Sequence, residues 1–402
     1  MGNKELSGFF EDYMKQESLF FNKKPLQSNY IPTNIPHREI QIQQIAGILA
    51  PALKGERPSN ILLYGKTGTG KTVSIKHITS EIQAVAEKNK LNLKIIYLNC
   101  KLGSSADTEY RVWAILAREL GEEVPKTGLP TNEIFNIFRD ALEKRNTLLV
   151  LILDEVDQLV NKAGGEILYS LVRLNSELKN SEICMIGIAN ELQFTDEIDS
   201  RVKSSLSEEV ISFPPYNAIE INGILTERAN IAFRKNTLGE GVIGKCAALA
   251  AREHGDARRA LELLRIAGEL AERKNENKVL IQHIDEAEEK IEKDTLIENV
   301  ETLPKQFKIT LYAILSVCLK SQNPVFTGDV YDIYKDYCFK CGLRPLTQRR
   351  VSDIIAELDM TGIIQTKVIS KGRYGRTRKI NIGMPPSVIP KVNTLLKDNL
   401  NL

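Results

Sequence analysis

Hydrophobic positions along the chain form three patterns in succession. Between residues 60 and 213, short uninterrupted apolar runs alternate with stretches that have helical spacing, such as residues 72–88 and 166–179. Most of the apolar runs are rich in Leu and β-branched residues, which is typical of parallel strands buried on both faces of a sheet. The predicted strands are residues 60–65, 93–99, 147–155, 183–190 and 208–213. This alternation predicts an α/β domain with a parallel sheet and right-handed crossovers.

The second and third patterns follow the last predicted strand. Residues 217–299 show helical spacing only, which predicts a separate small helical domain. Its predicted helices are residues 218–233, 242–255, 256–274 and 281–294. Beyond Pro304 the sequence predicts three helices and then two short strands, the order of a winged-helix domain. These elements are helices 305–320, 327–341 and 347–362 and strands 363–369 and 377–383. We expect domains at residues 1–213 (with an N-terminal arm over about 1–35), 214–300 and 301–402.

The composition is that of an ordinary globular protein, with 42% hydrophobic and 26% charged residues among 402. No apolar run reaches the roughly 18 residues that a membrane span needs, and the N-terminal residues lack the pattern of a signal peptide. Leu6 stands where N-myristoylation needs Ser or Thr. The six cysteines are scattered, which favours a reducing compartment. We therefore expect a cytoplasmic protein that does not bind membranes.

One pair of cysteines has metal-ligand spacing. Cys338 and Cys341 form a C-x-x-C pair, but no second Cys pair or His pair follows it. A structural zinc site needs four ligands. Packing at a helix end is therefore favoured over metal binding.

Charge divides the chain unevenly. Residues 301–402 hold 16 Lys and Arg against 8 Asp and Glu, a net of 16 − 8 = +8. The whole chain holds 54 Lys and Arg and 52 Asp and Glu. Residues 1–300 therefore hold 38 Lys and Arg against 44 Asp and Glu, a net of 38 − 44 = −6. A basic domain on a mildly acidic body suggests that the C-terminal end binds a polyanion.

The segment GKTGTGKT, residues 65–72, directly follows the first predicted strand and precedes a predicted helix. It matches G-x-x-x-x-G-K-[ST], in which glycines turn successive amide N–H groups toward phosphate oxygens and the helix N-terminus adds positive potential. Lys71 would reach the β- and γ-phosphates, and Thr72 would ligate Mg²⁺. The predicted contacts with the nucleotide here are Gly65, Lys66, Thr67, Gly68, Thr69, Gly70, Lys71 and Thr72.

A second motif, LLVLILDE, ends the third predicted strand with Asp154 and Glu155. Parallel α/β sheets bind their ligands at the carboxyl ends of the strands. Asp154 would hold Mg²⁺ through water, and Glu155 would polarise the attacking water. Together with the glycine-rich loop upstream, the pair predicts a site for phosphoryl transfer.

These two motifs resemble those of the AAA+ ATPases, and other positions fit the same family. The resemblance implies an AAA+ ATPase domain with a helical lid, with ATP or ADP and Mg²⁺ as its ligands. Asn190, in GIAN, matches the family's first sensor, which holds the attacking water. Arg201, in DSRVKSSL, stands where the family keeps an arginine finger. Arg258, in HGDARRAL, matches the second sensor on a lid helix that faces the γ-phosphate.

A closer resemblance is to the archaeal replication initiators, relatives of the eukaryotic origin recognition complex and cell-division-cycle type initiators. It extends over nearly the whole chain, from YIPTNIPHRE to the winged helix. In that family the segment before the first strand packs on adenine, and two residues at the start of the lid also contact the nucleotide. The matching residues are Ile31, Pro32, His37, Arg38, Tyr216 and Arg228.

The resemblance implies an ATP-dependent initiator that binds duplex DNA at replication origins and helps to recruit or load the replicative helicase. Other initiator paralogues are implied partners, and the nucleoid is the implied location. If Arg201 acts on a neighbouring subunit, isolated chains lack a contribution of about 10³–10⁵ in rate, so we expect a slow ATPase that serves as a nucleotide switch.

Two alternative functions remain open. One is a DNA-binding regulator with nucleotide as a structural ligand, and the other is a clamp-loader-like AAA+ enzyme that remodels proteins. The regulator is disfavoured because the chain has the complete set of predicted catalytic residues, Glu155, Asn190, Arg201 and Arg258. The basic C-terminal domain argues against the second.

The third helix of the C-terminal domain has the features of a recognition helix. Gln348, Arg349 and Arg350 lie in its first turn, where such helices present side chains to base edges in the major groove. A basic first turn also runs against the preference of helix N-termini for acids. The apolar residues that we expect to face the domain core are Val351, Ile354, Ile355 and Leu358.

The segment ISKGRYGRTRKI, residues 369–380, lies between the two predicted strands and reads as the wing. Gly372 and Gly375 supply the conformations that a tight tip needs. Arg373 and Arg376 would enter the minor groove, and neighbouring cations would contact phosphates. The DNA contacts predicted here are Lys371, Gly372, Arg373, Tyr374, Arg376, Arg378 and Lys379.

A further DNA contact is predicted in the insertion between the second and third strands, because the resembled family has an initiator-specific helical insertion there that approaches DNA. The candidates are Lys126, Thr127 and Gly128, in the loop after the predicted helix 107–120. Trp113 lies within that helix and is interpreted as a core residue rather than a platform for base stacking.

Overall fold

The computed structural model describes residues 17–101, 108–125, 128–191, 193–196, 198–319, 324–370 and 376–402, without the side chains of Ser370 and Arg376. The chain forms two compact units, Met1–Ile284 and Asp285–Leu402, and each is treated by itself. In the described part of the chain, no helix is both long and apolar enough to cross a membrane.

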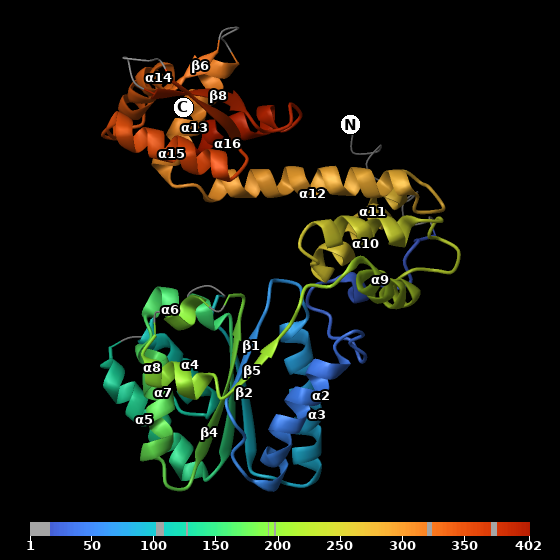
Figure 1. Cartoon of the computed structure of the whole chain (residues 1–402), viewed down its shortest axis with the longest axis vertical. Coiled ribbons are helices and arrows are strands. Elements are labelled where there is room, and N and C mark those ends of the chain that lie inside the picture. The colour runs from blue at the N-terminus through green and yellow to red at the C-terminus, as the bar shows by residue number, and fades with distance from the viewer. Residues whose placement is uncertain are drawn as a thin grey trace, which may run out of the picture. The chain divides into compact units, whose positions relative to one another are not determined.

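A five-stranded sheet forms the centre of the first unit (Figure 1). Its strands lie in the order β2-β3-β4-β1-β5, and every neighbouring pair is parallel. All five predicted strands are confirmed: β1 (Ile61–Tyr64), β2 (Leu93–Asn99), β3 (Leu148–Asp154), β4 (Glu182–Ala189) and β5 (Glu209–Ser212). Because the strands are parallel, the carboxyl ends of β1, β3 and β4 meet at one edge, the edge where such sheets bind ligands.

Alternate residues of the central strands pack on opposite layers of helices, which explains why the strands are apolar throughout. Ile61 and Leu63 belong to the core with α2 and α3, whereas Leu62 belongs to the core with α4 to α8. The helices and short helical turns of the two layers are α2 (Glu39–Leu49), η2 (Ala50–Lys54) and α3 (Lys71–Lys88), then α4 (Glu109–Glu119), α5 (Thr131–Arg145), α6 (Val156–Ala163), α7 (Glu166–Glu177), η4 (Gln193–Asp196) and α8 (Ser200–Leu206).

Trp113 on α4 is fully buried. Its ring lies 5.0 Å from the ring of Phe135 and 5.6 Å from that of Phe138, both on α5. The interpretation of Trp113 as a core residue is confirmed.

The helical part of the first unit consists of α9 (Ala218–Ala232), α10 (Val242–Arg252), α11 (Ala257–Arg273) and the start of α12 (Ile281–Thr302). Two of these helices begin at side-chain caps, which offset their unpaired N–H groups. Asn217 and Glu220 form a capping box on α9, and the Asp256 carboxylate accepts from the amides of Arg258 and Arg259 on α11. These caps mark where the first and third lid helices begin.

The N-terminal segment packs on these lid helices. Leu19, Phe20 and Leu26 are buried, and Phe20 forms a β-bridge with Phe233 at the end of α9. A short helix, η1 (Lys24–Leu26), ends this contact. The hydrophobic pattern did not predict this attachment, because a short apolar segment gives no signal of the surface on which it packs.

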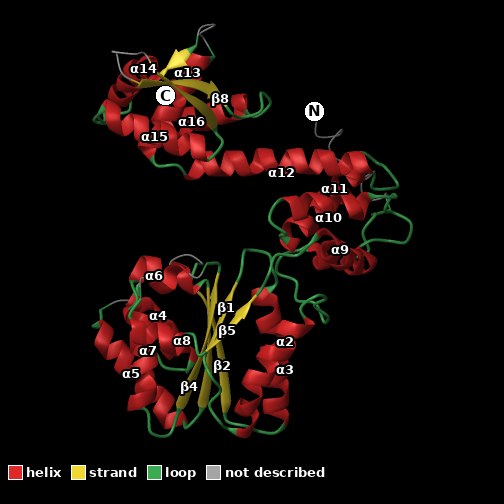
Figure 2. Cartoon of the chain, in the orientation of Figure 1, coloured by secondary structure: helices red, strands yellow, loops and turns green. Residues whose placement is uncertain are grey.

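The second unit is a compact helical domain with a three-stranded antiparallel sheet in the order β6-β8-β7 (Figure 2). The three helices and the hairpin predicted from the sequence are confirmed. The elements are α13 (Lys305–Cys318), β6 (Val325–Phe326), α14 (Thr327–Lys340), α15 (Gln348–Met360), β7 (Ile364–Ser370), β8 (Arg376–Ile382) and α16 (Ile389–Leu400). The two-residue β6 and the terminal α16 were not predicted.

Side chains at the predicted core positions of this unit pack as expected. Val351, Ile354, Ile355 and Leu358 on α15 are all buried in its core. At the end of α14, the Cys338 thiol lies 3.9 Å from Gln306 Oε1, and the Cys341 thiol lies 3.6 Å from the Leu400 carbonyl oxygen. The two cysteines thus contact helices α13 and α16.

Candidate functional site

The glycine-rich loop, residues 65–72, connects β1 to α3 at the carboxyl edge of the sheet. Gly68 has φ +69°, and a Cβ atom there would lie 1.7 Å from Oδ1 of Asp256, the residue that caps α11. Only glycine fits this position, because it tolerates positive φ and leaves room for the lid. Ala257 N donates to Gly68 O at 3.3 Å, so the loop touches the start of a lid helix directly.

Lys71 is 6% exposed and points back over the loop. Its ammonium donates to the carbonyl oxygens of Gly65 and, at 2.8 Å, Lys66, and to Asn190 Oδ1 at 3.2 Å. Burial, followed by the nearby Arg258 cation, lowers the pKa of Lys71 to about 8. A buried cation that faces a second cation and neutral carbonyl groups fits a polyphosphate, since phosphate oxygens would offset both charges.

Asp154 and Thr72 form a pair across the edge of the sheet. Thr72 Oγ1 donates to Asp154 Oδ2 at 2.9 Å, and Asp154 is 4% exposed. A hydroxyl and a carboxylate are hard oxygen ligands of the kind that Mg²⁺ accepts beside substrate phosphates. The donor set therefore fits the predicted metal site.

Tyr97 on β2 holds the same carboxylate, and the sequence analysis missed it. Its hydroxyl donates to Asp154 Oδ2 at 2.5 Å, and Lys76 Nζ lies 4.2 Å from the centre of its ring. Burial, then the hydrogen bond to Asp154, raises the pKa of Tyr97 far above its ordinary value, so the hydroxyl remains a donor. The parallel register of β2 and β3 brings Tyr97 to this site, and only strand pairing could reveal it.

Glu155 follows Asp154 in a left-handed conformation, φ 58° and ψ 47°. No described residue gives its Oε2 a hydrogen bond, and Lys101 Nζ lies 3.6 Å away. Asn190 lies on the other side of the loop, where its side chain accepts from Lys71. Its backbone N–H also donates to Asp157, whose pKa is raised because it is buried. The structure thus brings Lys71 and Asn190 into contact, with Glu155 directly after the Asp154 that binds Thr72.

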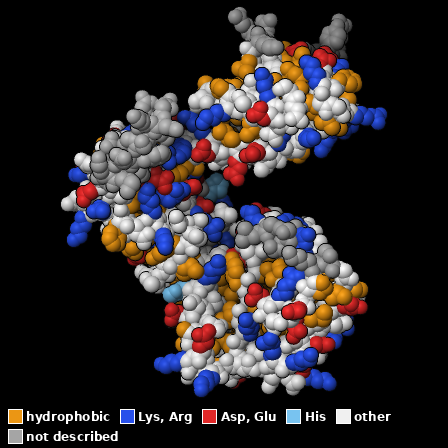
Figure 3. Space-filling model, turned by 180° about the vertical axis from the view of Figure 1, so that it is seen from behind, with side chains coloured by type: hydrophobic (Ala, Val, Ile, Leu, Met, Phe, Trp, Pro, Cys, Tyr) orange, Lys and Arg blue, Asp and Glu red, His pale blue; other side chains and the backbone are white. Residues whose placement is uncertain are grey.

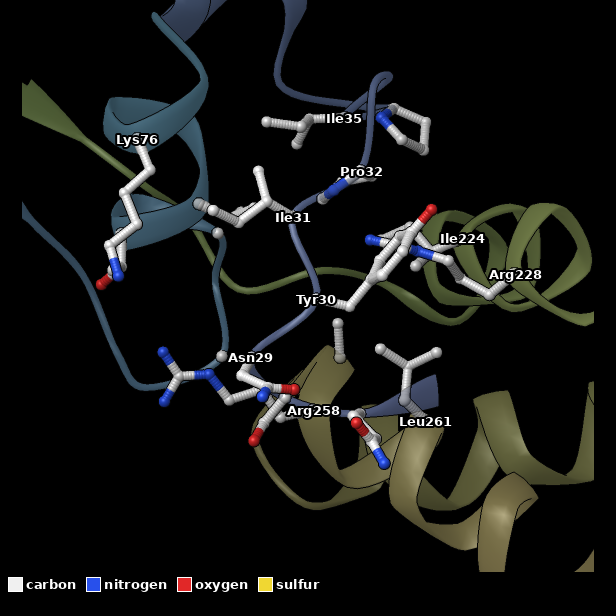
Figure 4. Close-up of a pocket in the computed structure, with 18 of the residues that line it drawn as sticks. Asn29, Tyr30, Ile31, Pro32, Ile35, Lys76, Ile224, Arg228, Arg258 and Leu261 are labelled. Atoms are coloured by element: carbon white, nitrogen blue, oxygen red, sulfur yellow. The ribbon is translucent and has the colours of Figure 1, made fainter. Parts of the chain in front are cut away.

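A cavity of about 140 Å³ opens next to this loop and is lined by both the sheet domain and the lid (Figure 4). One wall is residues 27–36, which we call the strap. Ile31 and Pro32 of the strap line the cavity, as do Gly68, Gly70 and Thr72 of the loop. The lid contributes Tyr216, Ile224, Arg228, Arg258 and Leu261. Its walls combine apolar side chains with a few cations, which suits a heterocyclic base and its phosphates.

Arg228 stacks on the strap. Its guanidinium lies 4.7 Å from the centre of the Tyr30 ring, and the two side chains lie side by side in Figure 4. Burial lowers the pKa of Arg228, and its buried Nη1 has no hydrogen-bond partner among the described residues. A buried N–H without a partner in a cavity wall fits an acceptor on a ligand.

Arg38 and His37 hold the downstream end of the strap and do not line the cavity. Arg38 Nε donates to Thr69 O at 2.8 Å and its Nη2 to Pro214 O at 2.5 Å, while its guanidinium lies 3.8 Å from the centre of the Tyr216 ring. His37 has φ 64° and approaches Gly223 on α9. Arg38 therefore fixes the phosphate loop rather than facing the cavity.

The two other predicted arginines differ in position. Arg258 lines the cavity at the start of α11. Arg201 lies on α8 with its side chain 71% exposed, paired with Asp199 at 3.1 Å, and it does not line the cavity. An exposed arginine away from the cavity of its own chain is available to a neighbouring molecule.

A second candidate surface lies on the second unit. Gln348, Arg349 and Arg350 are exposed in the first turn of α15, and Thr347 Oγ1 caps the helix by accepting from the Arg350 amide at 3.4 Å. The predicted wing is the β7–β8 hairpin, in which Ser370 pairs with Arg376. Arg378 and Lys379 lie on β8 and are half-buried.

Strand register adds a cation that the sequence analysis did not single out. Lys367 on β7 lies directly opposite Lys379 on β8. Like charges that face each other across strands destabilise a hairpin unless an anion lies between them or nearby. Lys367 therefore joins the candidate contacts with a polyanion.

Several predicted contacts lie outside the described residues. They are Lys126, Thr127, Lys371, Gly372, Arg373 and Tyr374, together with the side chain of Arg376. Charges on the first unit are mixed, as the face in Figure 3 shows, and residues 1–284 hold 36 Lys and Arg against 37 Asp and Glu.

Comparison with family models defines the class of protein. Residues 54–194 match the family described as "AAA domain", residues 222–289 the "Cdc6 AAA+ ATPase-type lid domain", and residues 298–392 the "CDC6, C terminal winged helix domain". The chain is thus an AAA+ protein with a Cdc6-type lid and a C-terminal winged helix, and the predicted fold class is confirmed.

Curated relatives identify the family more closely. The chain is 48% identical over 396 residues to an ORC1-type DNA replication protein of Thermococcus onnurineus, which covers 98% of the chain and 95% of the relative. It is 50% identical over 384 residues to ORC1-type DNA replication protein 1 of Archaeoglobus fulgidus, with coverages of 95% and 92%. The chain belongs to the family of ORC1-type DNA replication proteins, which confirms the resemblance to replication initiators.

A solved structure agrees with this assignment. The Aeropyrum pernix ORC1 protein, solved in complex with DNA, is 40% identical, with a TM-score of 0.83 and coverages of 96% of this chain and 98% of that one. The Cdc6p structure from Pyrobaculum aerophilum, at 22% identity and a TM-score of 0.60, shares the fold.

Proposed function

We propose that this chain is an ATP-dependent replication initiator that binds duplex DNA at origins through its winged helix and helps to recruit or load the replicative helicase. One observation carries the nucleotide part: buried Lys71 and the Thr72–Asp154 pair lie beside the cavity at the carboxyl edge of the sheet. The A. pernix relative in complex with DNA supports the DNA part.

The residues divide the work between binding and chemistry. The loop amides, Lys71 and Arg258 would bind the phosphates, and the cavity between strap and lid would hold the base. Thr72 and Asp154 would hold Mg²⁺, which supplies charge neutralisation on the phosphates when bound. Tyr97 keeps the carboxylate of Asp154 in place. Glu155 would accept a proton from the attacking water, and Asn190 would orient that water.

Hydrolysis by isolated chains should be slow. Arg201 does not line the cavity of its own chain, so we propose that it completes the site of a neighbouring chain. An arginine supplied in this way contributes about 10³–10⁵ in rate. Steady-state turnover per chain should therefore rise with protein concentration in the wild type and stay flat in Arg201→Ala. Fast turnover that is independent of concentration would contradict the proposal.

DNA binding divides between the helix and the wing. We propose that Gln348, Arg349 and Arg350 read base edges, whereas Lys367, Lys379 and Arg378 bind phosphates. Arg373, Arg376 and Lys371, and Lys126 with Thr127, remain predicted contacts. The same proposal includes the helicase and initiator paralogues as partners and an association with the nucleoid. It also includes the domain boundaries at residues 213 and 300. The +8 charge of residues 301–402 favours this function over a remodelling enzyme that acts on protein.

Fluorescence anisotropy on labelled duplexes tests the DNA function. Origin and scrambled duplexes are titrated at several salt concentrations with the wild type, Arg349→Ala and Lys367→Ala, each with ADP and with ATP. Arg349→Ala should reduce the preference for origin DNA by roughly 1–3 kcal/mol. Lys367→Ala should weaken binding to both duplexes and reduce the salt slope by about 0.9. Equal affinity of the wild type for both duplexes at every salt concentration would contradict origin recognition.

A further inference from the structure

The N-terminal residues 18–26, which we call the latch, attach to the lid through one buried carboxylate. Glu272 on α11 accepts from Ser18 Oγ at 2.5 Å, from the Leu19 amide at 3.0 Å and from Lys23 Nζ at 2.9 Å. Its side chain is 8% exposed. Burial acts to raise the pKa of Glu272, but the hydrogen bonds from Ser18 and Lys23 outweigh it, so that the net pKa is lowered. The latch therefore binds Glu272 as the charged carboxylate.

Backbone and aromatic contacts complete the attachment. The Phe21 and Asn22 amides donate to Ala232 O at 2.8 and 3.1 Å, at the end of α9. The Phe20 ring lies 4.4 Å from that of Phe233, and Lys23 Nζ lies 4.5 Å from the Phe20 ring. A Cβ atom on Gly268 would lie 2.4 Å from Phe20, so α11 has a glycine where the ring packs.

The latch leads straight into the cavity wall. The strap begins at Gln27, one residue after the latch ends, and nine of its ten residues line the cavity. The downstream end of the strap is held by Arg38 on the phosphate loop. A wall anchored at both ends is ordered before a ligand binds, so less conformational entropy is lost on binding. If the upstream anchor were released, the strap would keep only its downstream end.

We propose that Glu272 is a positioning residue for the nucleotide: through the latch it holds the strap against the lid, so that the wall of the base cavity is formed in advance. The proposal rests on the proposed nucleotide binding and adds a residue that does not line the cavity. It also assigns a role to the N-terminal segment, which becomes part of the lid and responds to what the cavity holds.

Binding measurements with the full chain test this role. In titrations with a fluorescent ADP analogue, Glu272→Ala should weaken affinity by about 3- to 10-fold. Displacement of the analogue by tripolyphosphate should reveal unchanged tripolyphosphate affinity, because only the base end is disturbed. Glu269→Ala is the matched control: it lies one turn earlier on α11 and pairs with Arg265 at 2.9 Å within the helix. This control should bind ADP like the wild type.

Hydrogen exchange separates positioning from a merely structural effect. Because coupling is reciprocal, ADP should slow exchange of the Leu19, Phe21 and Asn22 amides in the wild type by the same factor that the latch adds to ADP affinity. Glu272→Ala should remove this response, and Lys23→Ala should reduce it without a loss of folding.

The outcomes are distinct. If Glu272→Ala loses latch protection yet binds ADP like the wild type, or if ADP leaves the wild-type latch amides unchanged, the role of Glu272 is refuted. If the wild type itself binds neither ADP nor tripolyphosphate, the proposed nucleotide site is refuted instead.

Discussion

The two ends of the nucleotide site are built in different ways. The phosphate end comes from residues next to one another in the sequence, Gly65 to Thr72, and from Asp154 at the end of β3, which β4 separates from β1 in the sheet. The base end is a cavity whose walls come from the strap and from lid residues far along the chain, such as Arg228 and Leu261. The sheet holds the phosphate end in place, whereas the shape of the base end depends on the position of the lid.

This difference suggests how the protein responds to its ligand. Gly68 lies against Asp256 and accepts a hydrogen bond from the Ala257 amide, so the phosphate loop and the start of α11 are in direct contact. The same helix holds the latch through Glu272, and the latch leads into the strap. One lid helix therefore contacts both the phosphate loop and the latch, and the proposed nucleotide switch would act through this helix.

The largest effect should come from the phosphate end. Lys71→Ala removes the buried ammonium, and hydrogen bonds between a charged donor and phosphate contribute about 1.5–3 kcal/mol, or roughly 10- to 150-fold in affinity. We expect losses of this size for both ADP and tripolyphosphate, because the lost contact is with phosphate. Competition against a fluorescent ADP analogue measures both.

Lys88→Ala serves as the matched control for Lys71→Ala, since it removes an exposed lysine at the far end of α3, the helix that begins with Lys71. It should change either affinity by less than about threefold. If Lys71→Ala weakened ADP but left tripolyphosphate unaffected, the division between a phosphate end and a base end would be wrong.

The predicted residues of the phosphate end lie together in the structure, and for a physical reason. Its motif is local, and the five apolar runs fixed which strands precede Gly65 and deliver Asp154. Tyr97 escaped prediction because its role depends on the pairing of β2 with β3, and a tyrosine in a strand usually only packs. Lys367 escaped for the same reason, since strand register places it opposite Lys379.

The base end was predicted less completely. The resemblance to replication initiators predicted Ile31, Pro32, Tyr216 and Arg228, and all four line the cavity. Tyr30 and the whole latch were not predicted. No periodicity marks residues 18–26, because their partners, among them Glu272, lie more than 200 positions away along the chain. Long-range contacts of irregular segments leave no local pattern in a sequence.

A smaller effect should come from the base end, and it sharpens the comparison. Arg228→Ala removes the cation that stacks on Tyr30 and the unpaired buried Nη1 group. A cation–π contact contributes about 0.5–2 kcal/mol, so ADP affinity should fall by roughly 2- to 30-fold while tripolyphosphate affinity stays unchanged. Arg173→Ala, which breaks an exposed pair with Glu177 on α7, should alter neither affinity. Equal losses for both ligands would place Arg228 at the phosphates rather than at the base.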